Sequence, residues 1–107
     1  MKVFISHPMR GKTKDDFYRE KIRVYRLLVK QFPAEAERIH ILDTYIDEDY
    51  EENHPGLKYL AKSLELLDEA DLVFFAKGFR KARGCLIEYE AAKNYGISDI
   101  IIEEEDL

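Results

Sequence analysis

The residues best suited to chemistry lie between Arg83 and Glu88. Gly84 would let a ligand approach the backbone where a helix begins, and the free N–H groups of a helix start favour anions. Arg83 adds a fixed positive charge whose paired donors suit a phosphate or a carboxylate. Glu88 lies one turn further on, where the helix dipole favours a charged carboxylate by about 0.3–1 kcal/mol, and a charged carboxylate suits a nucleophile. The plainer interpretation, a surface cation followed by a favourable first-turn acid, stays open beside this one.

A second group of candidates follows the first predicted strand, residues 3–5, which is a short apolar run. Side chains just after it would point toward the crevice at the carboxyl end of a parallel sheet. There His7 could donate a hydrogen bond and Met9 could pack on a flat ring, or Pro8 could simply shape a turn. Phe79, in a later loop, could stack on a ring or cover the core. The candidate ligand-binding residues are Ser6, His7, Pro8, Met9, Arg10, Asp43, Gly78, Phe79, Arg83 and Gly84.

The loop after this strand also comes close to a phosphate-binding P-loop, because Gly11 is followed by Lys12 and Thr13. A P-loop needs glycine at its first position and successive backbone N–H groups. Here Ser6 occupies the first position, and Pro8 has no N–H to donate. The helical pattern also starts several residues after this loop. We therefore expect no nucleoside triphosphatase site.

Composition limits the remaining classes of function. The 107 residues include 22 acids and 17 bases, and the net charge of −5 disfavours a nucleic-acid polymer as partner. The three histidines lack the spacing of a metal site, and we expect neither a metal nor a cofactor. The single Cys85 cannot form an internal disulfide; near a helix start it is a thiol of lowered pKa or, as we favour, a small packing residue. The N-terminal apolar run is too short for a signal peptide or a membrane span, so we expect a cytoplasmic protein with no membrane partner.

Strand-like and helical patterns alternate along the whole chain. Short apolar runs predict strands at residues 3–5, 39–43, 72–76 and 100–102. Helical spacing predicts helices from about residue 15 to 32, 55 to 67 and 85 to 95, the last capped by Gly96. Short right-handed connections then favour one α/β domain over residues 1–107, flavodoxin/Rossmann-like, with three layers: a mostly parallel sheet of about four strands and helices on both faces. The expected buried stripes are Tyr18, Ile22, Tyr25, Val29 and Phe32 on the first helix, and Leu57, Leu60, Ala61, Leu64 and Leu67 on the second.

With these segments placed, the chain resembles the nucleoside 2-deoxyribosyltransferase-like superfamily, and within it a short branch of unassigned function from bacteria and their phages. Residues 4–11, 70–73, 82–92 and 95–97 carry the resemblance, in an order and spacing that run nearly end to end. The resemblance implies an activity that cleaves or exchanges the N-glycosidic bond of deoxynucleosides or of their 5′-monophosphates. It also implies a glutamate nucleophile four residues after a glycine, which maps onto Glu88. A nucleoside or nucleotide is thus the implied small-molecule partner.

The resemblance further implies a homo-oligomer, a dimer or larger, in which a neighbouring subunit completes each site. The aromatic residues Tyr18, Tyr25 and Phe32 of the first helix could serve that contact. Core packing explains the same three residues equally well.

The sequence departs from the active family pattern at three positions. Ala82 stands where an aspartate or serine often holds the sugar hydroxyls, and Ser63 stands where a second aspartate is expected. His7 occupies a position that is small, usually glycine, in many relatives. Asp43, an acid among residues 47–49, or a tail carboxylate from a neighbouring subunit could substitute for the missing acids.

Two principal interpretations of function therefore stay open. The first is an enzyme, an N-glycosidic bond transferase or hydrolase that acts through Glu88. The second is a catalytically inactive module that binds or sequesters a nucleotide-like metabolite. A purely structural subunit is a third interpretation.

Overall fold

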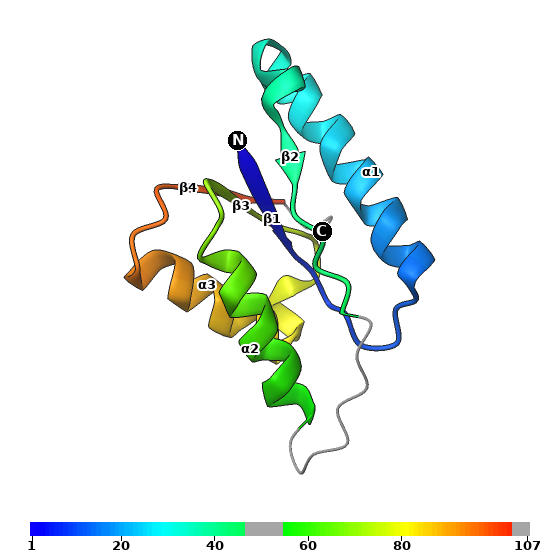
Figure 1. Ribbon diagram of the computed structural model, residues 1–107, viewed down its shortest axis with the longest axis vertical. Coiled ribbons are helices and arrows are strands. Elements are labelled where there is room, and N and C mark those ends of the chain that lie inside the picture. The colour runs from blue at the N-terminus through cyan, green and yellow to red at the C-terminus, as the bar shows by residue number, and fades with distance from the viewer. Residues whose placement is uncertain (47–54, 104–107) are drawn as a thin grey trace.

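The chain folds around a four-stranded parallel sheet that lies between two layers of helices (Figure 1). The computed structural model describes residues 1–46 and 55–103. The strand order is β2-β1-β3-β4, and each neighbouring pair is parallel. The predicted fold class is confirmed. The elements are β1 (Lys2–Ser6), α1 (Lys14–Gln31), the 3₁₀ helix η1 (Pro33–Arg38), β2 (His40–Ile41), α2 (Pro55–Leu67), β3 (Leu72–Phe75), the 3₁₀ helix η2 (Phe79–Lys81), α3 (Arg83–Asn94) and β4 (Asp99–Ile102).

The alternation of side chains along the strands divides the core into two layers. Val3 of β1 packs with Val24 of α1 on one face of the sheet. Phe4 points to the other face, where it packs with Cys85 of α3 in a second cluster. Figure 1 shows α1 on one side of the sheet and α2 with α3 on the other. Because side chains alternate with a period of two, Ser6 lies on the same face as Phe4, toward α3.

The predicted buried stripe of α1 is wrong by about one residue in register, or about 100° around the helix. The structure buries Phe17, Val24 and Leu28, whereas Tyr18 is 61% exposed and Tyr25 39% exposed. The tyrosine hydroxyls explain the choice, since they keep their hydrogen bonds at the surface while purely apolar side chains fill the core. Core packing is therefore not the role of these two tyrosines.

The start of α1 also differs from the prediction. Thr13 caps the helix, its hydroxyl accepting from the Asp16 N–H at 3.1 Å while the Asp16 carboxylate accepts from the Thr13 N–H at 2.8 Å. This reciprocal capping satisfies two donors at the helix start and fixes the first residue as Lys14. The argument that the helix starts too late for a P-loop is therefore wrong. The residue types of Ser6 and Pro8 still argue against such a loop.

The predicted buried stripe of α2 is correct in part. Leu67 is 4% exposed and Leu64 packs against the core, as predicted, whereas Leu57 is 62% exposed and the unpredicted Ser63 is 3% exposed. Sequence periodicity missed part of this face because it includes a serine.

The remaining element bounds shift only slightly. Strand β2 is limited to His40–Ile41, and α3 begins at Arg83 rather than at Cys85. Gly96 has a φ of 79°, as a glycine cap requires. The two short 3₁₀ helices had no sequence signal.

Candidate functional site

The carboxyl ends of β1 and β3 form the point in the sheet where the chain connections diverge. The connection after β1 leads to β2 at one edge of the sheet, whereas the connection after β3 leads to β4 at the opposite edge. In open parallel sheets, ligands bind in the crevice at such a point. Ser6, the last residue of β1, lies beside Phe75, the last residue of β3. The loops that follow these two residues are therefore the walls of the candidate site.

The two loops touch each other. Gly78 adopts a left-handed conformation with a φ of 86°, and a Cβ placed on it would lie 3.6 Å from Cγ of Pro8. The loop after β1 is closed by a turn in which the Lys12 N–H donates to the Met9 carbonyl at 3.1 Å. Pro8 and Gly78 thus sit at a shared boundary between the two walls, as the sequence analysis expected for residues at one sheet edge.

The centre of the site is a buried hydrogen bond between Ser6 and Glu88. The Ser6 hydroxyl donates to Oε1 of Glu88 at 2.8 Å across a sequence separation of 82 residues. Ser6 is fully buried and Glu88 is 2% exposed. The alternation of side chains along β1 places Ser6 on the face of the sheet that α3 covers, and Glu88 lies on the buried side of α3. The fold therefore joins one residue from each of the two candidate groups found in the sequence.

Burial controls the ionisation of Glu88. Loss of solvent raises the pKa of its carboxyl to about 7, and the Ser6 hydrogen bond opposes this only in part. The expectation of a carboxylate kept charged by the helix dipole is therefore wrong for this state of the protein. Because α3 begins at Arg83, Glu88 lies in its second turn, and the dipole acts mainly in the first. Burial thus favours the protonated carboxyl at a pH where an exposed glutamate is charged.

Cys85 completes the polar cluster one turn before Glu88. Its thiol is 3% exposed, and burial raises its pKa to about 11, with the charge of Glu88 adding to the rise. The nearby Ser6 hydroxyl opposes this rise in pKa only in part. Since Cys85 belongs to the core cluster beneath α3, the predicted packing role is confirmed.

His7 lies on the opposite face of the sheet from Glu88. Its ring is 6% exposed and meets the ring of Phe17 edge-on, with 4.8 Å between centroids. Burial lowers its pKa, which favours the neutral imidazole. The prediction that His7 points into the same crevice is wrong, because successive side chains after β1 alternate between the faces.

Phe79 lies in the core rather than in a binding crevice. It is 1% exposed and packs beside Phe75, with 5.1 Å between ring centroids, and beside Tyr89. The guanidinium of Arg80 lies over its ring. The structure therefore supports the interpretation that Phe79 packs in the core over the one in which it stacks on a ligand ring.

The predicted Arg-Gly turn is the first turn of α3 itself. Arg83 is exposed, and Gly84 is a half-buried helical residue without a positive φ. A Cβ on Gly84 would meet Cδ1 of Leu60 at an ordinary 3.9 Å, so a turn does not require glycine here. Ala82 precedes the helix and provides no side-chain cap, which leaves the helix start without a protein acceptor from that position.

Among the candidates for substitute acids, Asp43 is described by the structure and does not join Glu88. Asp43 is exposed, and its Oδ1 accepts from the Tyr45 N–H at 3.1 Å in a local turn. Burial and the Ser6 hydrogen bond are the resolved influences on the Glu88 pKa, with no second carboxylate among the described residues. Residues 47–49 and the end of the tail lie outside the described residues. Arg10 is exposed and Met9 is half-buried in their loop.

An ion pair between Arg23 and Glu103 lies at the same sheet edge, and no feature of the sequence predicted it. Glu103 accepts from the Lys77 N–H at 3.0 Å and from Arg23, whose Nη1 and Nη2 lie 2.6 and 3.0 Å from its two oxygens. Burial alone would raise the pKa of Glu103, but these hydrogen bonds outweigh it and lower the pKa. These contacts tie the loop after β3 to α1. A pairing across 80 residues leaves no local signal in the sequence.

Other classes of site find no support in the described parts of the chain. No three histidine, cysteine, aspartate or glutamate side chains come together there as metal ligands. No described helix has both the length and the apolar character to cross a bilayer. Comparison of the chain with protein families, curated proteins and solved structures gives no match.

Proposed function

We propose that the protein binds a nucleoside or nucleotide at the carboxyl ends of β1 and β3 and acts on its N-glycosidic bond through Glu88. The observation that carries the proposal is the buried Ser6–Glu88 hydrogen bond of 2.8 Å at this sheet edge. It agrees with the family resemblance, which implies a nucleophile at the same glutamate.

The energetics of burial support a functional role for Glu88. The rise in pKa from 4.5 to about 7 means that burying the charged carboxylate costs about 3 kcal/mol. That is a large fraction of the stability of an ordinary small domain. An apolar side chain in the same place would avoid this cost. Strongly shifted carboxyls of this kind concentrate at functional sites.

The proposed chemistry follows that of a retaining glycosidase. An oxygen of ionised Glu88 forms a bond to the anomeric carbon while the bond from that carbon to the base nitrogen breaks, and the electron pair leaves with the base, which takes up a proton. Water or a second base then attacks the anomeric carbon and releases the carboxylate. Ser6 acts as a positioning residue, since its hydroxyl holds one carboxyl oxygen. Arg83 at the exposed start of α3 suits a substrate phosphate.

Access to Glu88 requires a rearrangement of the loops. With 2% of Glu88 exposed, a sugar reaches it only if the residues that cover it move. Such a movement would also admit water, lower the pKa of Glu88 and favour the charged nucleophile. Substrate binding and activation of the carboxylate are coupled in this proposal.

A binding module without turnover is the second candidate function. It is favoured by Ala82 and Ser63, which provide no carboxylate where the family pattern has its helpers, and Ser63 is itself 3% exposed. Cleavage of a glycosidic bond generally needs a second acid or base beside the nucleophile.

One experiment with matched variants separates the two candidates. Wild-type protein, Glu88→Gln and Glu90→Gln are incubated with deoxynucleosides and their 5′-monophosphates, and released base is measured by chromatography. Glu90 is exposed on the same helix, so its variant controls for the loss of one charge. The enzyme interpretation expects release by wild type and Glu90→Gln and a loss of at least about a hundredfold in Glu88→Gln. Base release that persists in Glu88→Gln would remove Glu88 as nucleophile.

A thermal shift with the same compounds supplies the other half of the test. A ligand at about 100 times its dissociation constant adds about 2.7 kcal/mol of stability. Stabilisation without base release supports the binding module. No stabilisation and no release contradict both candidates.

A further inference from the structure

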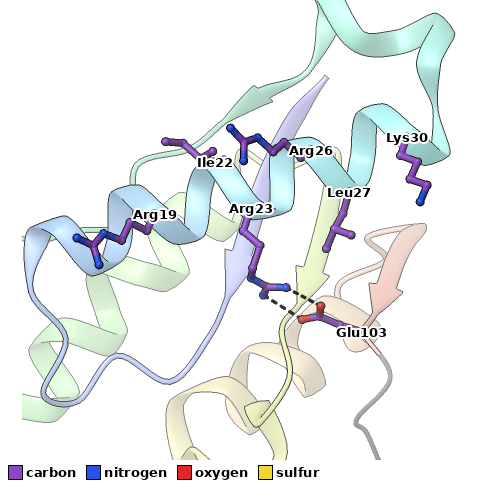
Figure 2. Close-up of a pocket in the computed structure, with 7 residues that line it drawn as sticks. All are labelled: Arg19, Ile22, Arg23, Arg26, Leu27, Lys30 and Glu103. Atoms are coloured by element: carbon purple, nitrogen blue, oxygen red, sulfur yellow. Dashed lines mark hydrogen bonds and ion pairs between the residues drawn. The ribbon is translucent and has the colours of Figure 1, made fainter.

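A groove of about 610 Å³ runs along α1 beside Glu103 (Figure 2). Four of its lining residues are cations, and their spacing of three or four residues keeps them within about 60° of one another around the helix. Figure 2 shows these side chains projecting from one stretch of α1, with Arg23 reaching Glu103 after the end of β4. The lining residues are Arg19, Ile22, Arg23, Arg26, Leu27, Lys30 and Glu103.

The groove already holds one carboxylate. Arg23 grips Glu103 through both guanidinium ends, at 2.6 and 3.0 Å, and the same Arg23 also binds Glu20. This two-point geometry is the one by which arginine recognises carboxylates. The hydrogen bonds to Glu20 and Glu103 raise the pKa of Arg23 above its ordinary value. The chemistry of the groove is therefore that of a carboxylate receptor.

The groove cations beyond Arg23 form no ion pair within the described part of the chain. Residues 21–31 contain four lysines and arginines and no acid, although the whole chain has a net charge of −5. Arg26 and Lys30 are exposed and form no ion pair with any described residue. Other exposed cations on helices do pair with an acid three or four residues away, as Arg19 does with Asp15 and Lys62 with Glu65. The segregation of charge on α1 thus leaves two cations for an outside partner.

Apolar surface lies beside these two cations. Leu27 is 39% exposed between Arg26 and Lys30 in sequence, and Ile22 lines the same groove. A phosphate backbone has no apolar groups to pack against this surface, whereas an acidic peptide that also contains leucine or isoleucine would bury it.

We infer that the α1 groove is a docking site for a carboxylate-rich segment of another protein, whose acids pair with Arg26 and Lys30 and whose apolar side chains cover Leu27. Glu103 on Arg23 marks one end of the site and shows the type of group that it accepts. Since Arg23 is occupied, the incoming carboxylates bind further along the helix, toward its C-terminal end. This inference does not depend on the proposed chemistry of Glu88.

The test uses a fluorescein-labelled synthetic peptide of glutamate and leucine residues and measures its binding by anisotropy at moderate and high salt. The site variant is Arg26→Glu with Lys30→Glu, and the control is Arg38→Glu with Lys62→Glu, which changes the net charge equally at exposed positions outside the groove. We expect binding to wild type and to the control, and an affinity about tenfold or more lower for the site variant. Circular dichroism of each variant establishes that it is folded.

Three results would overturn the inference. Equal binding of the peptide by the site variant and the control would show that the groove is not used. A single-stranded oligonucleotide of equal charge that binds as tightly, with the same dependence on Arg26 and Lys30, would show an unspecific anion surface. Much tighter peptide binding after truncation at Glu103 would identify residues 104–107 of the chain itself as the occupant. Binding that truncation leaves unchanged supports a separate partner.

Discussion

Replacing Glu88 with glutamine should make the protein more stable at neutral and alkaline pH. The native pKa of about 7 lies above the ordinary 4.5, so the folded state holds the Glu88 proton more tightly than the unfolded chain does. Wild-type stability is therefore highest, in this respect, below pH 4.5 and falls as the pH rises through about 7. Glutamine has nearly the same shape and no charge to bury, so the free energy of unfolding of Glu88→Gln does not decrease in this way as the pH rises. It also keeps an amide that can hydrogen-bond Ser6.

The size of the effect follows from the two pKa values. Between about pH 5 and about pH 8 the free energy of unfolding of wild type should fall by about 2 to 3 kcal/mol relative to Glu88→Gln. Urea unfolding followed by circular dichroism at several pH values measures this difference directly. Glu90→Gln, on the exposed side of α3, is the control and should run parallel to wild type. A difference between wild type and Glu88→Gln that stays constant over this range, or changes in the opposite sense, would refute the reasoning.

Three further predictions concern the neighbours of this carboxyl and the ion pair of Glu103. Ser6→Ala should lower stability by about 1 kcal/mol and raise the pKa of Glu88 further, because it removes a buried hydrogen bond; an NMR titration that shows an unchanged or lower pKa would contradict this. Cys85, with a pKa of about 11, should react with a thiol reagent near pH 8 only on unfolding, and rapid labelling of the native protein would show that its burial is wrong. Glu103→Gln should lower stability by about 1 kcal/mol at neutral pH by weakening the grip of Arg23 and should remove part of the stability that wild type loses below pH 4.5; identical acid unfolding of the two proteins would contradict the pairing.

The fold could be predicted because its signals are local and repeated. Strand β3 is a continuous apolar run that is buried on both faces, and alternation with helices leaves few arrangements other than a parallel sheet. Errors occurred where residue types were ambiguous. The buried face of α1 was predicted wrongly because Tyr18 and Tyr25 were counted as apolar core residues. The buried face of α2 was predicted only in part because it includes the polar Ser63.

The candidate site could be predicted only in outline. Placing residues after strands located Ser6 and Glu88 at one sheet edge, but no local pattern indicated their direct hydrogen bond, which spans 82 residues. The burial of the site residues could not be predicted from the sequence. The raised pKa of Glu88 depends on burial by residues far away in the chain, and so does the position of Phe79 in the core. His7 was misplaced because the loop continues the alternation of β1 beyond its last residue.

The identity of the atom that attacks the sugar tests the account most directly. The protein is incubated with a deoxynucleoside 5′-monophosphate, quenched in acid, digested and analysed by mass spectrometry. The account predicts a deoxyribosyl ester on the peptide that contains Glu88, present in wild type and Glu90→Gln and absent in Glu88→Gln. Base release without any adduct on Glu88, or with an adduct on another residue, would contradict it.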